Sequence, residues 1–163
     1  KHSNRPIVIS HANPDWWHPS KRNKSHKLIK AITEANGIIG FSLYPHHLKD
    51  GSNCSLESFS QMIAEAASRY GVDSLGIGSD ICQGQPDSVV EWMRNGTWSK
   101  DMNFGEGSRD KAGFPDQPHW FSRIKDFPNL KIGLQKEGFS TVEIEKILGM
   151  NWLRFYDENF CPE

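Results

Sequence analysis

Histidine and acidic side chains follow three short apolar segments of this chain. Ser10-His11 follows the first segment, Tyr44-Pro45-His46-His47 the second, and Ser79-Asp80 the third. Imidazole nitrogens bind zinc, and a carboxylate can accept a proton from a metal-activated water. Each residue also has an ordinary structural interpretation, because loop histidines commonly form hydrogen bonds and aspartates commonly cap turns or helices. The pattern alone leaves both interpretations open.

The elements that must position these residues form a repeating pattern. Residues 6–10, 37–43 and 74–78 are β-branched or glycine-rich without polar alternation, which is typical of parallel strands buried on both faces. Apolar residues at helical spacing follow Ser25 and Ser55. This β-α-β-α-β order predicts a parallel sheet with right-handed crossovers. Since the carboxyl ends of parallel strands meet at one edge, we expect the three groups of polar residues to lie together.

The later part of the chain has a different character. Residues 81–118 are rich in Gly, Pro, Asp and Asn, and a loop of this length commonly has a function. Helices are predicted over 119–125, from Ser140 with Glu143 completing a capping box, and over 152–156. Three parallel strands cannot close a barrel and leave two open edges, so we expect other strands beside them.

Composition excludes several classes of function. Lys+Arg total 19 and Asp+Glu total 20 in 163 residues, so the net charge of −1 gives no reason to expect nucleic acid or an anionic membrane as partner. No apolar stretch has the length of a membrane span. The cysteines Cys54, Cys82 and Cys161 are odd in number and widely spaced, which favours free thiols and a cytoplasmic location. The chain opens at Lys1 without an initiator Met, so we expect a piece of a longer protein.

Four motifs in register carry a family resemblance: Ser10-His11, Lys21-Arg22-Asn23, Gly76-Ile77-Gly78-Ser79-Asp80 and Gly149-Met150-Asn151-Trp152-Leu153-Arg154. Together they resemble the membrane (renal) dipeptidase family, di-zinc peptidases of the amidohydrolase type on a (β/α)8 barrel. The resemblance implies that residues 1–163 are the carboxy-terminal half of a single metallo-dipeptidase barrel domain. That half would comprise three parallel strands with crossover helices, followed by a helical tail.

The resemblance also implies roles for individual residues. His11 would bind one of two zinc ions, and Asp80 would accept a proton from the metal-activated hydroxide that attacks a dipeptide. Arg22 would bind the substrate carboxylate. The family has a substrate-contacting Tyr in the loop after the second strand; by offset it falls near His47, with Tyr44 close by. Asn151 to Arg154 would tie the last helix to the barrel.

Two departures from the family pattern bear on activity. Relatives usually follow the catalytic Asp with Phe-Asp-Gly, whereas this chain has Ile81-Cys82-Gln83-Gly84. No His-x-Asp pair occurs in the chain, although the family's first strand supplies one. A catalytic zinc needs about three protein ligands. We therefore expect the chain to be inactive without the amino-terminal half of the same barrel.

Several alternatives stay open. The complete protein could be a related amidohydrolase acting on N-acyl amino acids or lactams. It could also be a non-catalytic barrel that binds ligands through its pocket or through Gln83 to Pro118. A third interpretation, independent of the resemblance, is a small α/β binding domain complete in these residues. The exact substrate and the formation of a homodimer are not determined by the sequence.

Overall fold

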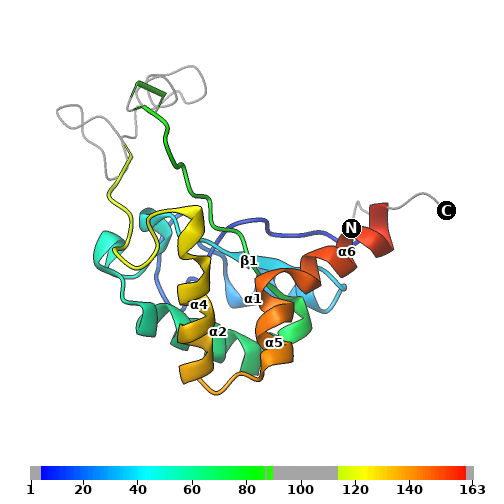
Figure 1. Cartoon of the computed structure of the whole chain (residues 1–163). Helices are drawn as coiled ribbons and strands as arrows, with labels where there is room; N and C mark the ends of the chain where they lie inside the picture. Colours follow the sequence, from blue (N-terminus) through cyan, green and yellow to red (C-terminus); the bar gives the residue numbers. More distant parts are fainter. Residues whose placement is uncertain (1–4, 87, 90–113, 161–163) are drawn as a thin grey trace, which may run out of the picture.

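The computed structural model describes residues 5–86, 88–89 and 114–160, so most of the predicted loop over 81–118 lies outside the described residues. Helices surround a short parallel sheet (Figure 1). The elements in chain order are α1 (His26–Thr33), β1 (Ile39–Phe41), the 3-10 helices η1 (Pro45–His47) and η2 (Gly51–Asn53), α2 (Leu56–Tyr70), the 3-10 helix η3 (Val72–Ser74), β2 (Leu75–Ile77), the 3-10 helix η4 (Ile124–Asp126), α4 (Phe127–Lys136), α5 (Thr141–Glu145), the π-turn η5 (Lys146–Met150) and α6 (Asn151–Phe160).

The sheet of the described residues has two parallel strands, with Gly40 of β1 opposite Gly76 of β2. The parallel pairing that the sequence predicts is confirmed, but the predicted first strand over 6–10 is reduced to one parallel bridge between Ile9 and Ile39. The Ile9 N–H donates to Ile38 O at 2.8 Å, and the Gly40 N–H donates to Ile9 O at 2.7 Å. Ile7 is 55% exposed. Among the described residues this segment pairs with β1 alone, so it lies at an edge of the sheet and its pairing is short.

Local capping accounts for the helices that the sequence predicts. Ser25 Oγ accepts the N–H of Leu28 at the start of α1, and Ser55 Oγ accepts the N–H of Ser58 at the start of α2. The capping box that begins α5 at Ser140 is confirmed. Each cap satisfies backbone N–H groups that have no partner inside the helix.

The predicted helix over 119–125 is wrong for residues 119–123, because the 3-10 helix η4 begins only at Ile124 and α4 only at Phe127. The Asp126 carboxylate accepts the backbone N–H groups of Ser122 and Arg123, each at 2.9 Å, and so caps the start of η4 at Arg123. Pro128 then occupies the first turn of α4, where its missing N–H costs nothing.

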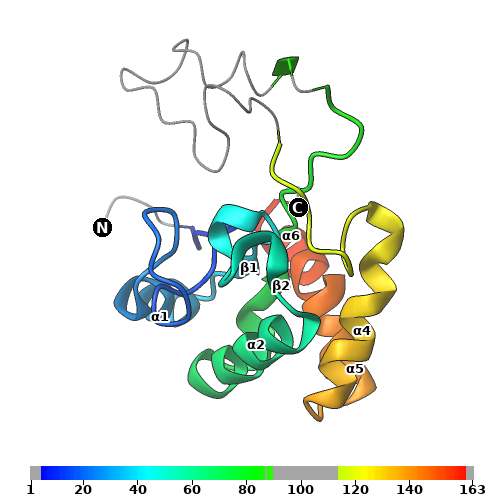
Figure 2. The same ribbon diagram turned by 90° about the vertical axis from the view of Figure 1, so that its left-hand side faces the viewer.

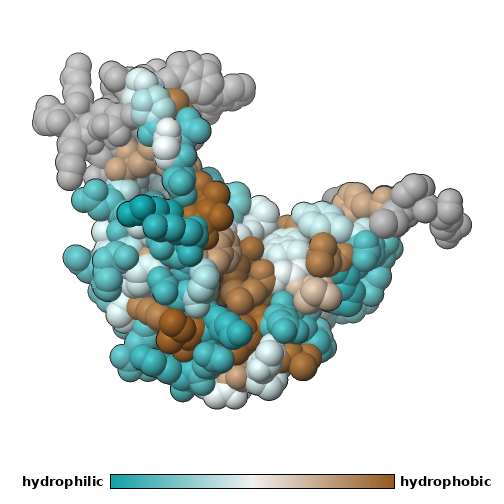
Figure 3. All heavy atoms as spheres, in the orientation of Figure 1, coloured by the Kyte–Doolittle hydropathy of each residue, from teal (hydrophilic) through white to brown (hydrophobic). Residues whose placement is uncertain are grey.

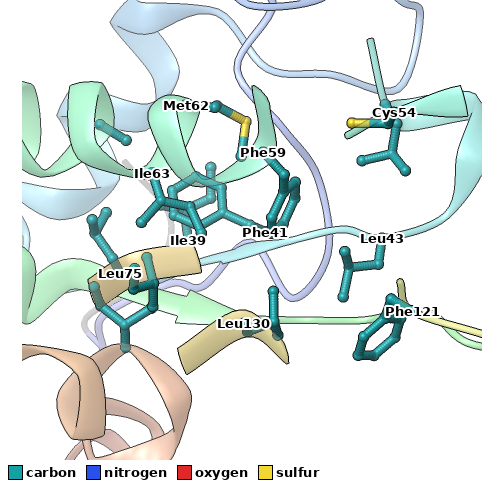
Figure 4. Close-up of a cluster of buried hydrophobic side chains, with 14 of the residues drawn as sticks. Ile39, Phe41, Leu43, Cys54, Phe59, Met62, Ile63, Leu75, Phe121 and Leu130 are labelled. Carbon is teal, nitrogen blue, oxygen red and sulfur yellow. The ribbon is translucent and has the colours of Figure 1, made fainter. Parts of the chain in front are cut away.

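One hydrophobic core lies between the sheet and the helices that cover one of its faces. In Figure 4, Phe59 and Ile63 of α2 point toward Ile39 and Phe41 of β1. The helices α2 and α4 lie side by side in both views (Figures 1 and 2). The long side chains of the strands therefore face this core, and the residues between them face the opposite way.

The opposite face of the sheet carries glycines and receives the helical tail. Trp152 of α6 lies against Gly40 and Gly76, and its indole Nε1 donates to Ile77 O at 3.1 Å. The Asn151 amide donates to Val72 O and Leu75 O, both at 2.8 Å. These contacts agree with the structural role expected for Asn151 to Arg154.

Two further expectations can be compared with the described residues. No helix among them has the length and apolar character needed to cross a membrane. Cys54 and Cys82 are both free thiols. Cys161 lies outside the described residues.

We predict that Gly76→Ala destabilises the protein and that a smaller residue at position 152 relieves part of the loss. A Cβ at Gly76 would overlap the indole of Trp152, and overpacking of this kind costs about 1–3 kcal/mol. Urea unfolding measures the free energy of unfolding of Gly76→Ala, Trp152→Leu and the double variant. The double variant should lose less stability than the sum of the losses in the two single variants. Additive losses would show that the two residues do not compete for this space.

Candidate active site

His11 and Asp80 lie together at the carboxyl ends of the first and third segments of the sheet. His11 Nε2 is 3.9 Å from Asp80 Oδ2, and the two side chains are 37% and 36% exposed. Both groups are therefore accessible while being partly shielded from water. This geometry confirms the expectation that parallel strands bring these two positions to the same edge.

Backbone packing holds His11 beside the third segment. The Ser10 carbonyl lies over Gly40 and Gly78, and a Cβ at either glycine would overlap it. A Cβ at Gly78 would also come within 3.2 Å of His11 Cα. The chain at Ser10-His11 can approach so closely only because these positions lack side chains.

Asp80 adopts a backbone conformation that most residues avoid. Its φ is +52°, in the left-handed region. Such a conformation costs about 1–2 kcal/mol for a non-glycine residue, although Asp and Asn tolerate it better than others. Strained positions of this kind concentrate at functional sites.

Burial and nearby charges determine the proton affinities in the site. Burial raises the pKa of the Asp80 carboxyl above its ordinary value, and the charges of His11 and Arg22 oppose that rise. Burial and the Arg22 charge lower the pKa of His47 to about 4, with smaller contributions from His11, His46 and Lys24. His47 is therefore neutral at neutral pH, and Asp80 is a stronger base than an exposed aspartate.

A buried polar network connects the loops after the first two segments. The Asn13 amide nitrogen donates to Ser42 O at 3.0 Å and to His47 O at 2.9 Å, while Asn13 Oδ1 accepts the Ser42 N–H at 3.0 Å. Asn23 Oδ1 accepts the Asn13 N–H, and the Asn23 amide donates to His47 O. All four residues are at most 8% exposed. Because removal of one partner would leave buried polar groups unsatisfied, this network holds the loops in register.

The network places the residues that the resemblance assigns to substrate. Arg22 is exposed and immediately precedes the buried Asn23, and its charge acts on both Asp80 and His47. His47 is 2% exposed, and its Nδ1 lies 2.7 Å from Ser42 Oγ. Tyr44 is partly exposed, with its ring 5.5 Å from that of His47.

The sequence interpretation missed Asn13 and Ser42, and it gave no role of its own to Ser10. Ser10 Oγ lies 2.8 Å from His11 Nδ1. The bonds of Asn13 join residues 29 and 34 positions apart, which no local pattern reveals. The one available signal was position, since Asn13 lies three residues after the end of the first segment and two residues after His11.

The donor set fits a contribution to a zinc site. A neutral imidazole nitrogen is an ordinary zinc ligand, and Nε2 of His11 faces the carboxylate while Nδ1 faces Ser10. Among the described residues, no three His, Cys, Asp or Glu side chains group closely enough to hold a metal ion. His11 therefore fits one coordination position, and the other ligands would have to come from elsewhere.

Comparison with known proteins identifies a family of similar sequences. The sequence profile of the family described as membrane dipeptidase (peptidase family M19) matches residues 1–96. Dipeptidase tcpJ of Claviceps purpurea (strain 20.1) is 26% identical over 154 residues, which cover 94% of this chain and 29% of that protein. A protein of Klebsiella pneumoniae, described only by its position in the pqqA 5' region, is 23% identical over 157 residues, covering 94% of this chain and 46% of its own.

Two solved structures share the fold. An amidohydrolase from Pseudomonas aeruginosa superposes with a TM-score of 0.81 at 27% identity, covering 94% of this chain and 45% of its own. A metallopeptidase from Rhodobacter sphaeroides, bound to a phosphinate mimic of the dipeptide L-Ala-D-Ala, gives a TM-score of 0.71 at 19% identity. The match covers 97% of this chain and 37% of that protein. The chain spans less than half the length of each of these four proteins.

We predict that Asp80→Gly is more stable than Asp80→Ala by about 1 kcal/mol, because only glycine relieves the positive φ. Ser79 does not share this conformation, so Ser79→Ala should instead be more stable than Ser79→Gly. Urea unfolding of the four variants measures both differences. If alanine were the more stable replacement at both positions, Asp80 would not be strained.

Proposed function

The chain belongs to the membrane dipeptidase family, peptidase family M19, and we propose that it is the carboxy-terminal half of a (β/α)8 barrel that hydrolyses dipeptides with zinc. The observation that carries this proposal is the pair formed by His11 Nε2 and Asp80 Oδ2, 3.9 Å apart at the strand ends. A relative called a dipeptidase, and a metallopeptidase of the same fold that binds a dipeptide mimic, support the choice of substrate.

In this proposal His11 is a ligand of one of two zinc ions through Nε2. The ions, when bound, lower the pKa of a water molecule and polarise the scissile carbonyl. Asp80 accepts the proton of the attacking water at a carboxylate oxygen. Its burial suits this role, because a base whose pKa is raised holds the proton more firmly.

Arg22 binds the carboxylate of the dipeptide. Its side chain is exposed, and its charge acts on the same two residues, Asp80 and His47, that border the site. A guanidinium can bind a carboxylate through two parallel hydrogen bonds and so orient it. Of the two further substrate residues, Tyr44 is the more accessible, and its ring contacts that of the buried His47.

The half-barrel part of the proposal rests on surfaces that a complete barrel would cover. Ile7 at the outer edge of the sheet is 55% exposed, and Met150 and Leu153 are 54% and 57% exposed. Ile144, Leu148, Met150 and Leu153 line a groove of about 320 Å³. Figure 3 shows apolar surface in this region between α4 and α6. We propose that the amino-terminal half of the same barrel packs on the sheet edge at Ile7 and on this groove. Because that half would supply the other metal ligands, the chain alone is inactive.

A related amidohydrolase activity on N-acyl amino acids or lactams is the second candidate. It is favoured by the likeness to the P. aeruginosa amidohydrolase, at 27% identity, and by the changed segment Ile81 to Gly84 beside Asp80. Gln83 Oε1 in that segment accepts the Ile124 N–H at 2.9 Å, so the segment joins the edge of the site to the helical tail. Comparing dipeptides with N-acyl amino acids and lactams as substrates separates the two candidates.

We predict that Asp80→Asn in the complete barrel lowers kcat for dipeptides by about 10²–10⁴, the usual contribution of a general base. Asparagine tolerates a positive φ, so the variant should remain folded and bind zinc. Asp73→Asn is the matched control, because Asp73 precedes the same strand β2 at its opposite end and its side chain is 70% exposed.

The measurement is steady-state kinetics on zinc-loaded protein, with zinc content determined for each variant. Asp73→Asn should match the wild type. Normal turnover by folded, zinc-loaded Asp80→Asn would contradict the role of Asp80, whereas turnover without zinc would contradict the metal-dependent chemistry.

A further inference from the structure

We propose that Ser10 is a positioning residue whose hydroxyl accepts the Nδ1 proton of His11 and so directs Nε2 of that ring toward Asp80. The inference rests on the proposed function, in which Nε2 of His11 is a zinc ligand. A neutral imidazole carries one N–H, so a proton kept on Nδ1 leaves Nε2 with its lone pair free. Nothing in the family resemblance assigned a role to Ser10.

The contact has the geometry of a hydrogen bond. Ser10 Oγ is 2.8 Å from His11 Nδ1, within the ordinary range. On the other side of the ring, Nε2 is 3.9 Å from Asp80 Oδ2, which is too long for a hydrogen bond. Asp80 therefore does not hold the ring in this way, and the serine hydroxyl is the polar group that orients it.

The backbone that carries this hydroxyl is rigidly held. The Ile9 carbonyl accepts the Gly40 N–H at 2.7 Å, and the Ala12 N–H donates to Gly40 O at 3.0 Å. Between these two bonds the Ser10 carbonyl packs over Gly40 and Gly78. A hydroxyl on so fixed a backbone restrains the ring at little entropic cost, because few degrees of freedom remain to be lost.

The neighbouring histidine has the same arrangement. Ser42 Oγ lies 2.7 Å from His47 Nδ1, and the rings of His11 and His47 stack with centroids 6.4 Å apart at an angle of 22°. Each of the two imidazoles thus has Nδ1 next to a serine at the end of the segment that leads into it. For a histidine that binds a metal, a partner on the other ring nitrogen fixes the tautomer and the ring orientation, and its loss lowers metal affinity about 10–100-fold.

The test uses the complete barrel and three variants. Ser10→Ala removes the hydroxyl, Ser10→Thr keeps it, and Ser68→Ala on the exposed surface of α2 is the control. Zinc affinity is measured by competition with a chelating dye, and the His11 ring nitrogens are observed by 15N NMR in zinc-loaded protein. Ser10→Ala should bind zinc about 10–100-fold more weakly and lose the slowly exchanging Nδ1 proton. Ser10→Thr and Ser68→Ala should match the wild type.

The outcomes separate the two proposals. If wild type binds zinc and hydrolyses dipeptides while Ser10→Ala has unchanged zinc affinity, the positioning role of Ser10 is overturned and the proposed function stands. The same role is overturned if Ser10→Thr loses affinity as strongly as Ser10→Ala, since the hydroxyl would then not be the relevant group. A wild-type barrel that binds no zinc overturns both.

Discussion

The close packing of the Ser10 carbonyl over Gly40 and Gly78 decides where the candidate site lies. This contact brings the end of the first segment against the end of the third, although β1 lies between them in sequence and in the sheet. His11 follows Ser10 directly, and Asp80 lies two residues after Gly78, so their 3.9 Å separation depends on the absence of two side chains. Any side chain at these glycines would push the two chain segments apart and enlarge the gap between imidazole and carboxylate.

The remaining parts of the site depend on this contact through the buried polar network. Asn13 lies three residues after the first segment; its backbone N–H bonds to Asn23 beside Arg22, and its side-chain amide bonds to Ser42 and His47. Such a network is costly unless every member is bonded, which makes the loop positions specific. The consequence is an uncharged His47 in a region that already contains the charge of Arg22.

Local signals predicted the parts of the fold that depend on neighbouring residues. The caps at Ser25, Ser55 and Ser140 and the parallel pairing of β1 with β2 follow from short-range spacing and element order. The strand over 6–10 was predicted too long, because the length of a strand depends on the strands that pair with it, and these are not visible in its own sequence. The helix over 119–125 was predicted to begin too early, because the Asp126 side chain caps the chain at Arg123 and helical structure begins only at Ile124.

The candidate site divides in the same way. The proximity of His11 and Asp80 could be predicted, since parallel strands present their ends together. The roles of Asn13 and Ser42 could not, because they arise from contacts across about 30 residues of sequence. The strain at Asp80 was also hidden, since aspartate is common in turns of every kind.

The most direct test of the central claim is the metal dependence of dipeptide hydrolysis by the complete barrel. Purified protein would be treated with a chelator, dialysed, assayed with a dipeptide, and assayed again after zinc is added back. The account predicts loss of turnover with loss of zinc and recovery with about two zinc ions per chain, the number that two-metal hydrolysis requires. Full turnover by metal-free protein, or a zinc-loaded barrel with no activity on any dipeptide, would contradict it.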